Sequence, residues 1–254
     1  MKAQEKELIY NLLKAASGNF YGYTSPVYQK SPCFTDDKII EKPVSPSFTQ
    51  TEKKENIKSD SVLSLSEKIK NCQRCPLHST RTNVVPGMGV IDSSVLVIGE
   101  GPGEEEDKQG LPFVGTAGQL LDKMLAAIQL DRNKNCYIAN VVKCRPPYNR
   151  DPKPEEALAC KSFLDAQIHL LKPKIILALG KVAVKNLLNI QEEFSLNKYR
   201  KQIFEYNNVP LIVTYHPSAL LRNIEFKKPA WEDLKFFKSE LEKLCPDYAK
   251  DFIQ

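Results

Sequence analysis

The chain contains seven cysteines, and four of them have spacings suited to metal binding. Cys72 and Cys75 form a C-x2-C knuckle, and Cys144 and Cys160 form a second pair with fifteen residues between them. Four thiolates are enough ligands for one zinc ion or one iron–sulfur cluster. The spacing leaves both alternatives open, together with a third in which the knuckle is free of metal and the second pair is buried.

A second group of chemically useful residues follows apolar runs that are typical of buried strands. Gly99–Gly103 follows one such run, Asn140 ends another, and His216–Ser218 follows a third. In an open parallel sheet, ligands bind outside the carboxyl ends of the strands, because loops converge there and helix N-termini point their amides inward. Six of the eleven glycines lie between residues 99 and 118, which indicates that a ligand or another backbone segment comes close to this loop.

Three common motifs do not fit these residues. A dinucleotide fingerprint needs glycine where Glu104 stands, and a Walker A loop needs Ser or Thr where Val182 follows Gly180 and Lys181. Ser218 lies outside any G-x-S-x-G elbow. These departures argue against nucleotide hydrolysis and against serine-hydrolase chemistry.

Apolar periodicity places the reactive residues in an alternation of strands and helices. Buried strands are predicted at Val95–Gly99, Cys136–Asn140, Lys174–Leu179 and Leu211–Tyr215. Helices are predicted at Ala117–Leu130, Pro154–Leu171, Lys181–Leu188 and Pro229–Leu244. This alternation is typical of an α/β domain with a parallel sheet wrapped by helices.

The first 60 residues differ in composition from the rest of the chain. Gly18–Asp60 contains no leucine but thirteen Ser, Thr and Pro residues, so we expect it to be largely flexible. Helical spacing of Leu and Ile over residues 8–13 predicts a short amphipathic helix before it. We therefore divide the chain into an N-terminal extension, residues 1–60, whose partner is unknown, and one folded domain, residues 61–254.

Charge and hydropathy indicate which partners and which cellular compartment to expect for the protein. Lys and Arg number 36 against 31 Asp and Glu, and this net charge of +5 permits a polyanionic partner without requiring one. No apolar run approaches the roughly 20 residues that span a bilayer, and the first residues do not read as a signal peptide. We expect a cytoplasmic monomer without a membrane partner, in which cysteines serve metal binding, catalysis or burial.

In this order, on successive strand ends, the motifs resemble those of the family 4 uracil-DNA glycosylases, the iron–sulfur branch of their superfamily. The resemblance covers about residues 63–244 and rests on the Cys72/Cys75 knuckle, Gly99–Glu104, Pro112–Gly115, Asn140–Pro147, Cys160 and His216–Ser218. It implies a three-layer α/β/α fold with a central four-stranded parallel sheet. The implied enzyme hydrolyses the N-glycosidic bond of deoxyuridine in DNA and leaves an abasic site for base excision repair. The four cysteines would hold a structural [4Fe-4S] cluster, with zinc as the less favoured alternative.

The resemblance also implies a pocket for an extruded base. A base inside a duplex is out of reach, so the deoxyuridine must leave the stack before it reacts. Phe113 is expected to stack on the uracil, and Asn140 to hydrogen-bond its O4 and N3–H edge. Glu106, or the backbone near it, is expected to fill the space of a 5-methyl group and so reject thymine.

Cleavage of the glycosidic bond needs groups aimed at developing charge. Negative charge grows on uracil O2, and His216 is the expected hydrogen-bond donor to that atom. The best-known branch of the superfamily has an aspartate where Gly101 stands, and uses it to position water. Glu100 is therefore the candidate for orienting water or the pocket backbone here.

Contact with DNA, single- or double-stranded, is expected around the same pocket. Ser218 and Arg222 are candidates for phosphate contacts, and Leu220 or Leu221 for filling the gap left in the base stack. Two basic patches flank the pocket in the sequence: Lys143, Arg145, Arg150 and Lys153 in one, and Arg222, Lys227 and Lys228 in the other. Phosphate contacts by such patches would make binding fall steeply with salt.

Two other readings have different consequences. A metal-bearing DNA-binding module that has lost the reaction would bind uracil-containing DNA without cutting it, although the joint presence of Phe113, Asn140 and His216 argues against it. A zinc-stabilised nucleotide-binding protein would be colourless and contain zinc without iron.

Overall fold

The computed structural model describes residues 50–250 and 252, with side chains from residue 60 onward. Internal contacts divide the chain into two units, Met1–Phe48 and Thr49–Gln254, and the described elements lie in the second. Its first helix, α2 (Gln50–Lys70), begins before the predicted domain start at Ser61. The rest of the predicted flexible segment and the predicted helix at residues 8–13 lie outside the described residues.

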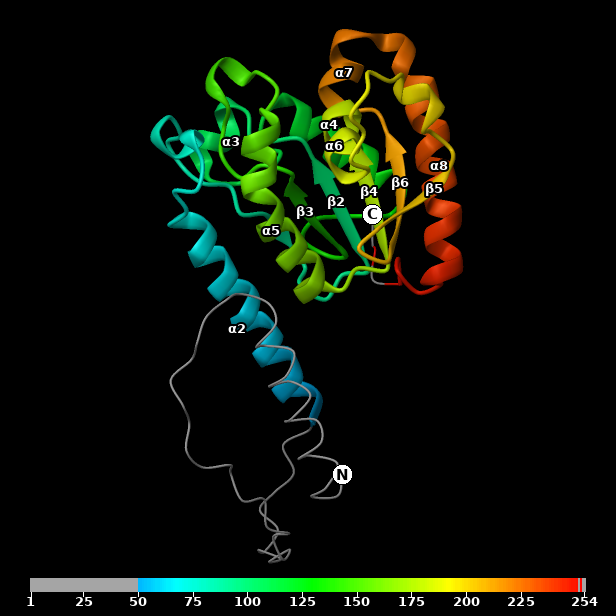
Figure 1. Cartoon of the computed structure of the whole chain (residues 1–254). Coiled ribbons are helices and arrows are strands. Elements are labelled where there is room, and N and C mark those ends of the chain that lie inside the picture. Colours follow the sequence, from blue (N-terminus) through cyan, green and yellow to red (C-terminus); the bar gives the residue numbers. More distant parts are fainter. Residues whose placement is uncertain (1–49, 251, 253–254) are drawn as a thin grey trace, which may run out of the picture. The chain divides into compact units, whose positions relative to one another are not determined.

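The central sheet has the strand order β1-β3-β2-β4-β6-β5. Its four inner strands run parallel, as predicted, and they are β2 (Val95–Gly99), β3 (Cys136–Asn140), β4 (Ile175–Leu179) and β6 (Val209–Thr214). Nearly all of their residues are buried, which is the continuous apolar pattern of strands covered on both faces. The loops after β2, β3 and β6 meet at one end of the molecule, the upper end in Figure 1.

Two antiparallel edge strands extend the sheet from the predicted four strands to six. They are β1 (Met88–Gly89), which pairs with β3, and β5 (Ile203–Tyr206), which pairs with β6. Because β1 has only two residues, it contains no apolar run from which a strand could be predicted. β5 joins β6 through Asn207 and Asn208, whose φ angles of 50° and 61° make the two-residue hairpin turn that asparagine favours. That asparagine pair is a sequence signal for β5 that periodicity alone overlooks.

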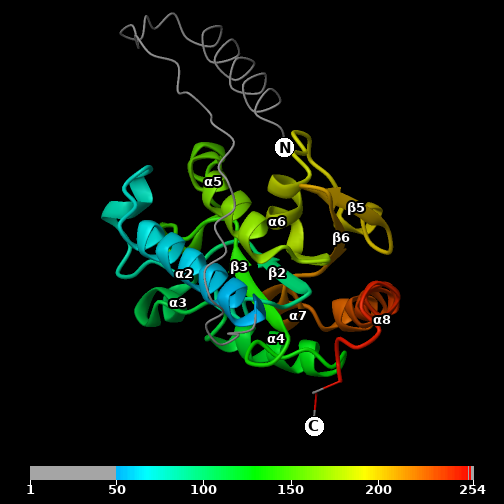
Figure 2. The same cartoon turned by 90° about the horizontal axis from the view of Figure 1, so that it is seen from below.

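Helices cover both faces of the sheet, so the fold is the expected three-layer α/β/α arrangement. Figure 2 shows α5 and α6 on one face and α4 and α8 on the other. Apart from α2, which has 21 residues, the remaining helices are short and lie mainly in the connections. The bounds are α3 (Glu104–Gln109), α4 (Thr116–Ala126), α5 (Pro154–Leu171), α6 (Gly180–Leu187), α7 (Pro217–Arg222), α8 (Lys227–Leu244), and the 3-10 turns η1 (Pro76–Ser79), η2 (Pro147–Asn149), η3 (Leu196–Lys198) and η4 (Ile224–Phe226).

Alternate residues of each strand supply the two halves of the core. In β2, Leu96 and Ile98 pack in the cluster that contains α5 and α6, whereas Val95 and Val97 pack with α4 and α8. A third, smaller cluster of Ile69, Leu77, Val84, Cys144 and Phe163 joins α2, η1 and α5 beside the cysteines. Within residues 50–250, none of the helices is long and apolar enough to span a membrane.

Candidate active site and cysteine cavity

A cavity of about 410 Å³ lies where the loops after β2, β3 and β6 converge. This volume is in the range of sites for small molecules or single bases. Eight of the residues predicted from the sequence line it together: Glu100, Gly101, Glu106, Phe113, Asn140, His216, Ser218 and Arg222. Pro146, Asn149, Arg150 and Asp151, from the loop after β3, complete one wall.

Leu220 does not belong to this group. Its side chain is 3% exposed and packs in the core beneath α7, so it is not available to enter a base stack. Its neighbour Leu221 is 49% exposed and precedes Arg222, which lines the cavity. The sequence offered either Leu220 or Leu221 for filling the gap in the base stack. Only Leu221 is exposed at the surface, so it is the leucine that could do so.

Phe113 is held in an unusual backbone conformation. Its φ angle of 53° lies in the left-handed region, which costs a residue with a Cβ about 1–2 kcal/mol. Arg132 stabilises this turn by donating to the carbonyl oxygens of Pro112 and Phe113 at 2.6 and 2.9 Å. Arg132 is in turn held by Asp122 through a 2.6 Å ion pair. The aromatic ring is thus positioned by a clamp on its own backbone.

Glycines make room for this arrangement. A Cβ at Gly99 would lie 2.5 Å from both Oδ1 of Asn140 and the tip of the Phe113 ring. A Cβ at Gly118 would lie 1.9 Å from the carbonyl oxygen of Phe113. Two of the clustered glycines are therefore explained by close packing of the pocket against its own backbone, and not by contact with a ligand.

Asn140 brings an unsatisfied hydrogen-bond acceptor to the cavity. Its side chain is 1% exposed, and its Oδ1 atom has no hydrogen-bond partner. The backbone carbonyl of the same residue accepts a 2.8 Å hydrogen bond from the buried ammonium of Lys143, which also donates to Gln167 at 2.6 Å. Since buried polar atoms are almost always paired, the free Oδ1 indicates that a ligand supplies the missing donor.

The Glu106 carboxylate links two loops of the pocket. Its Oε1 accepts hydrogen bonds of 2.9 Å from the backbone amides of Val114 and Gly115, and its Oε2 accepts one of 3.1 Å from Gly103. These three contacts hold the loop after β2 against the loop that carries Phe113. Glu106 therefore shapes the pocket wall through the backbone as well as lining it.

His216 is held as a neutral ring with a defined tautomer. Its Nδ1 atom accepts a hydrogen bond of 3.2 Å from the Ser218 backbone amide and lies 2.8 Å from the Ser218 hydroxyl. Because an amide nitrogen can only donate, the ring proton is on Nε2. Burial, reinforced by the charge of Arg222, lowers the pKa of His216 to about 4, and Glu106 opposes this shift. The ring centroid lies 5.6 Å from that of Phe113.

Glu100 is a carboxyl group with a strongly raised pKa. Burial raises the pKa of Glu100 to about 7, the negative charge of Asp151 adds to this effect, and Arg222 opposes it. A carboxylate that titrates near neutral pH is suited to proton transfer or to orienting water. Glu100 thus gains its negative charge as the pH rises through about 7, whereas the His216 ring is already neutral in this range.

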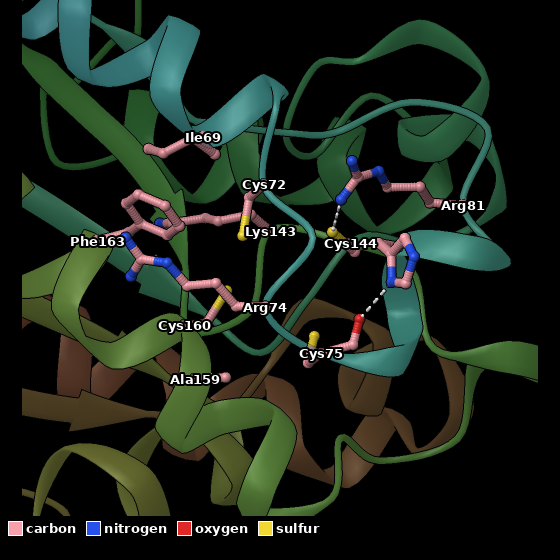
Figure 3. Close-up of a pocket in the computed structure, with 11 residues that line it drawn as sticks. Ile69, Cys72, Arg74, Cys75, Arg81, Lys143, Cys144, Ala159, Cys160 and Phe163 are labelled. Atoms are coloured by element: carbon pink, nitrogen blue, oxygen red, sulfur yellow. Dashed lines mark hydrogen bonds between the residues drawn. The ribbon is translucent and has the colours of Figure 1, made fainter.

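A second cavity contains the four cysteines of the predicted metal site. Figure 3 shows the sulfur atoms of Cys72, Cys75, Cys144 and Cys160 around one hollow. The knuckle pair comes from the segment between α2 and η1, and the other pair from the loop after β3 and from α5. Arg81 donates to the Cys144 sulfur at 3.1 Å. Cys136 and Cys245 lie outside this cavity and are buried elsewhere in the core.

The cavity presents four sulfur donors, from Cys72, Cys75, Cys144 and Cys160, which is the number that one iron–sulfur cluster or one zinc ion takes. Among the described residues, no three His, Cys, Asp or Glu side chains converge closely enough to hold a single metal ion. Zinc requires sulfurs about 2.3 Å from a common point. Burial raises the pKa of Cys144 to about 11, although Arg81 opposes the shift. A bound cationic group would favour the thiolate form that ligation needs.

Some residues that build the site carry no signal in the sequence. Arg132 and Asp122 hold the Phe113 turn, and Gln167 contacts Lys143 from α5. They lie outside the motifs they support, and each reads as an ordinary surface or helix residue. Lys143, expected in a basic surface patch, is 1% exposed and therefore lies outside any DNA-contacting surface.

Comparisons with known proteins agree with this geometry. The family model of the uracil DNA glycosylase superfamily matches residues 86–235. The match covers more than half of the chain and shows that the chain belongs to this superfamily.

Characterised relatives define the branch. The chain is 46% identical over 182 residues to the type-4 uracil-DNA glycosylase of Thermotoga maritima, covering 70% of this chain and 94% of the relative. Type-4 enzymes of Sulfurisphaera tokodaii and Archaeoglobus fulgidus are 43% and 39% identical, covering 83% and 91% of their lengths and 69% of this chain. The chain is therefore a member of the type-4 group, as its motifs indicated.

The charge state of His216 can be measured directly. The chain has three histidines, and His78 and His169 are exposed, so nitrogen-15 NMR of labelled protein should resolve them. We expect His216 to be the Nε2–H tautomer at neutral pH and to titrate near 4. Arg222→Ala should raise this pKa because it removes a nearby positive charge, whereas Lys228→Ala should not. Titration of the His216 ring near its ordinary value of about 6.5 would contradict the assignment.

Proposed function

We propose that this protein is a monofunctional uracil-DNA glycosylase that hydrolyses the N-glycosidic bond of deoxyuridine in DNA and leaves an abasic site. The observation that carries the proposal is the single cavity lined by the Phe113 ring, the Asn140 amide and the His216 imidazole. The cavity holds one base, so the nucleotide must be extruded from the stack before it reacts. The names and similarity of the type-4 relatives support the same reaction.

Asn140 is proposed to select uracil. Its unpaired Oδ1 would accept a hydrogen bond from uracil N3–H, and its amide nitrogen would donate to O4. Cytosine presents an acceptor at N3 and a donor at N4, so it would leave the buried Oδ1 unsatisfied. Phe113, fixed by the Arg132 clamp, would stack on the selected base.

His216 is proposed to be the main catalytic residue. Departure of uracil places negative charge on its O2 atom and positive charge on the sugar. A neutral imidazole with its proton on Nε2 can donate to O2 without adding a full positive charge beside the developing sugar cation. The Ser218 amide fixes this tautomer before DNA binds, because it occupies Nδ1.

Glu100 is proposed to orient the attacking water. Gly101 supplies no carboxylate, and Glu100 is the acidic group beside it that lines the cavity. In its ionised form it would accept a hydrogen bond from water and stabilise the sugar cation. Glu106 is proposed to act in specificity, by holding the backbone of Gly103, Val114 and Gly115 where a 5-methyl group would collide.

The DNA strand is proposed to cross the mouth of the cavity. Ser218 and the exposed Arg222 would contact phosphates. Leu221, rather than the buried Leu220, would fill the gap left in the base stack. Arg145 and Arg150 are engaged with Glu104 and Glu156, so these two arginines shape the loop after β3 more than they attract phosphate. Both single- and double-stranded DNA are compatible with this path.

The four cysteines are proposed to hold a [4Fe-4S] cluster, with zinc as the less favoured alternative. A bound cluster would supply a structural cross-link, since glycosidic hydrolysis contains no redox step. Cys72 and Cys75 would be joined to the segments that carry Cys144 and Cys160, which fixes the loop after β3 near the base pocket. A cytoplasmic location is proposed because these thiols must remain reduced, and a monomer because the cavity is complete within one chain.

An excision assay tests the activity. Protein incubated with a uracil-containing oligonucleotide, followed by alkaline cleavage, should cut the strand at uracil. His216→Ala should lower kcat by about 100- to 1,000-fold, the loss seen when one donor to a developing negative charge is removed. Ile203→Ala, an exposed residue of β5, is the matched control and should leave the rate unchanged. An intact strand at stoichiometric wild-type enzyme would favour the non-catalytic DNA-binding alternative.

The pH dependence of the reaction tests Glu100. Since the carboxylate form is needed, kcat/KM should rise with pH through about 7, the pKa that burial gives this group. Glu100→Gln should remove this rise, whereas Glu104→Gln, which alters an exposed acid in α3, should retain it. A rise that persists in Glu100→Gln would assign the titration to another group.

Metal analysis tests the cysteine cavity. Anaerobically purified protein should be brown and contain about four iron and four sulfide per chain. Cys144→Ser should lose iron and unfold at lower temperature, because Cys144 lines the cavity. Cys245→Ser, also buried but outside the cavity, should keep its iron. A colourless protein with stoichiometric zinc would overturn the cluster assignment.

A further inference from the structure

Tyr148 has an exceptional position for an aromatic residue. Its side chain is 99% exposed, the highest value among the exposed large hydrophobic side chains of the described residues. It lies in η2, at the tip of the loop between β3 and α5. A tyrosine so placed gains nothing from burial, so packing does not account for it.

The backbone at this position disfavours a side chain. Tyr148 has φ 57° and ψ 21°, and Asn149 has φ 55°, so two consecutive residues with Cβ atoms adopt the left-handed conformation. Glycine would adopt it without steric cost. Unfavourable backbone geometry at a residue whose own side chain is not buried is the observation from which a functional role is inferred.

The loop holds Tyr148 firmly. Arg145 Nε donates to the Asn149 side chain at 2.8 Å, and the Asn149 amide donates to the Pro146 carbonyl at 3.1 Å. On the other side, Arg150 makes a two-point ion pair with Glu156, at 2.8 and 2.7 Å. The exposed ring is therefore carried by a braced turn.

This turn forms the rim of the base pocket. Pro146, Asn149 and Arg150 line the cavity, and Ser218 and Arg222 line it from α7. Tyr148 and the exposed Leu221 thus belong to the two elements that flank the cavity. In Figure 1 the loop that enters α5 and helix α7 both lie at the upper end of the molecule, where the strand ends converge.

We propose that Tyr148 is a stacking platform for the base next to the extruded deoxyuridine. This inference rests on the proposed function, because extrusion of a base removes a stacking partner from its neighbours. An aromatic ring fixed at the pocket rim replaces that partner whatever the neighbouring base is, since every base has a π-face. Tyr148 does not contact the reacting atoms, so its contribution lies in DNA binding.

Substitution at Tyr148 separates the ring from the hydroxyl. Tyr148→Ala should raise KM for a single-stranded uracil oligonucleotide roughly 5- to 150-fold, the range seen when a base-stacking aromatic is removed, with kcat nearly unchanged. Tyr148→Phe and Tyr148→Trp should retain the wild-type KM. Ile203→Ala is the control for loss of an exposed apolar side chain. Ile203 lies in β5, the edge strand at the opposite side of the sheet from β1.

The substrate tests the contact itself. With an oligonucleotide in which both nucleotides next to deoxyuridine lack a base, wild type and Tyr148→Ala should have the same KM. With 2-aminopurine as the neighbouring base, binding to wild type should quench its fluorescence relative to Tyr148→Ala. An effect of Tyr148→Ala that is equally large on the substrate without flanking bases would overturn the stacking assignment.

Tyr148→Gly distinguishes loss of the ring from loss of folding. Glycine suits the left-handed backbone, so this variant should melt at or above the wild-type temperature while its KM rises as in Tyr148→Ala. Wild-type KM in both variants, with normal excision by wild type, would refute the inference and leave the proposed function intact. Absence of excision by wild type would instead refute the function on which it rests.

Discussion

The register of the parallel strands is the constraint on which the rest of the molecule depends. Gly99 pairs with Asn140 at the ends of β2 and β3, and Leu179 pairs with Thr214 at the ends of β4 and β6. Because side chains alternate between faces, a slip of one residue would turn Asn140 away from the cavity. The segments carrying Glu100 and His216 start from these same strand ends. Backbone pairing along the parallel strands therefore sets the positions of the reactive groups.

The base pocket and the cysteine cavity share the segment that follows β3. Asn140 ends the strand in the pocket, and Cys144 lines the other cavity four residues later. Lys143 lies between them, since it lines the cysteine cavity and donates to the Asn140 carbonyl. Gln167 holds the same ammonium and donates to the Pro86 carbonyl. One short stretch of chain thus lines both the base pocket and the cysteine cavity.

The sequence is informative wherever one residue type is required at one position. Buried parallel strands need unbroken apolar runs, so β2 and β3 are predicted to the residue, and the motifs at their ends identify most of the pocket. Features that depend on pairs of distant residues are not visible in this way. Arg132 supports Phe113 only because the fold brings them together, and the alternation of burial along α7 decides between Leu220 and Leu221. The exposure of Tyr148 likewise emerges only from the shape of its loop.

The three backbone hydrogen bonds of Glu106 have a consequence for the thermodynamics of recognition. They connect the loop after β2 to the Phe113 turn through contacts made entirely within the chain. The conformational entropy of ordering these loops is thus lost when the chain folds and not when a nucleotide enters. In the role proposed for Glu106, a wall braced in this way would discriminate between uracil and its 5-methyl analogue by steric fit, because it would not relax around the larger base.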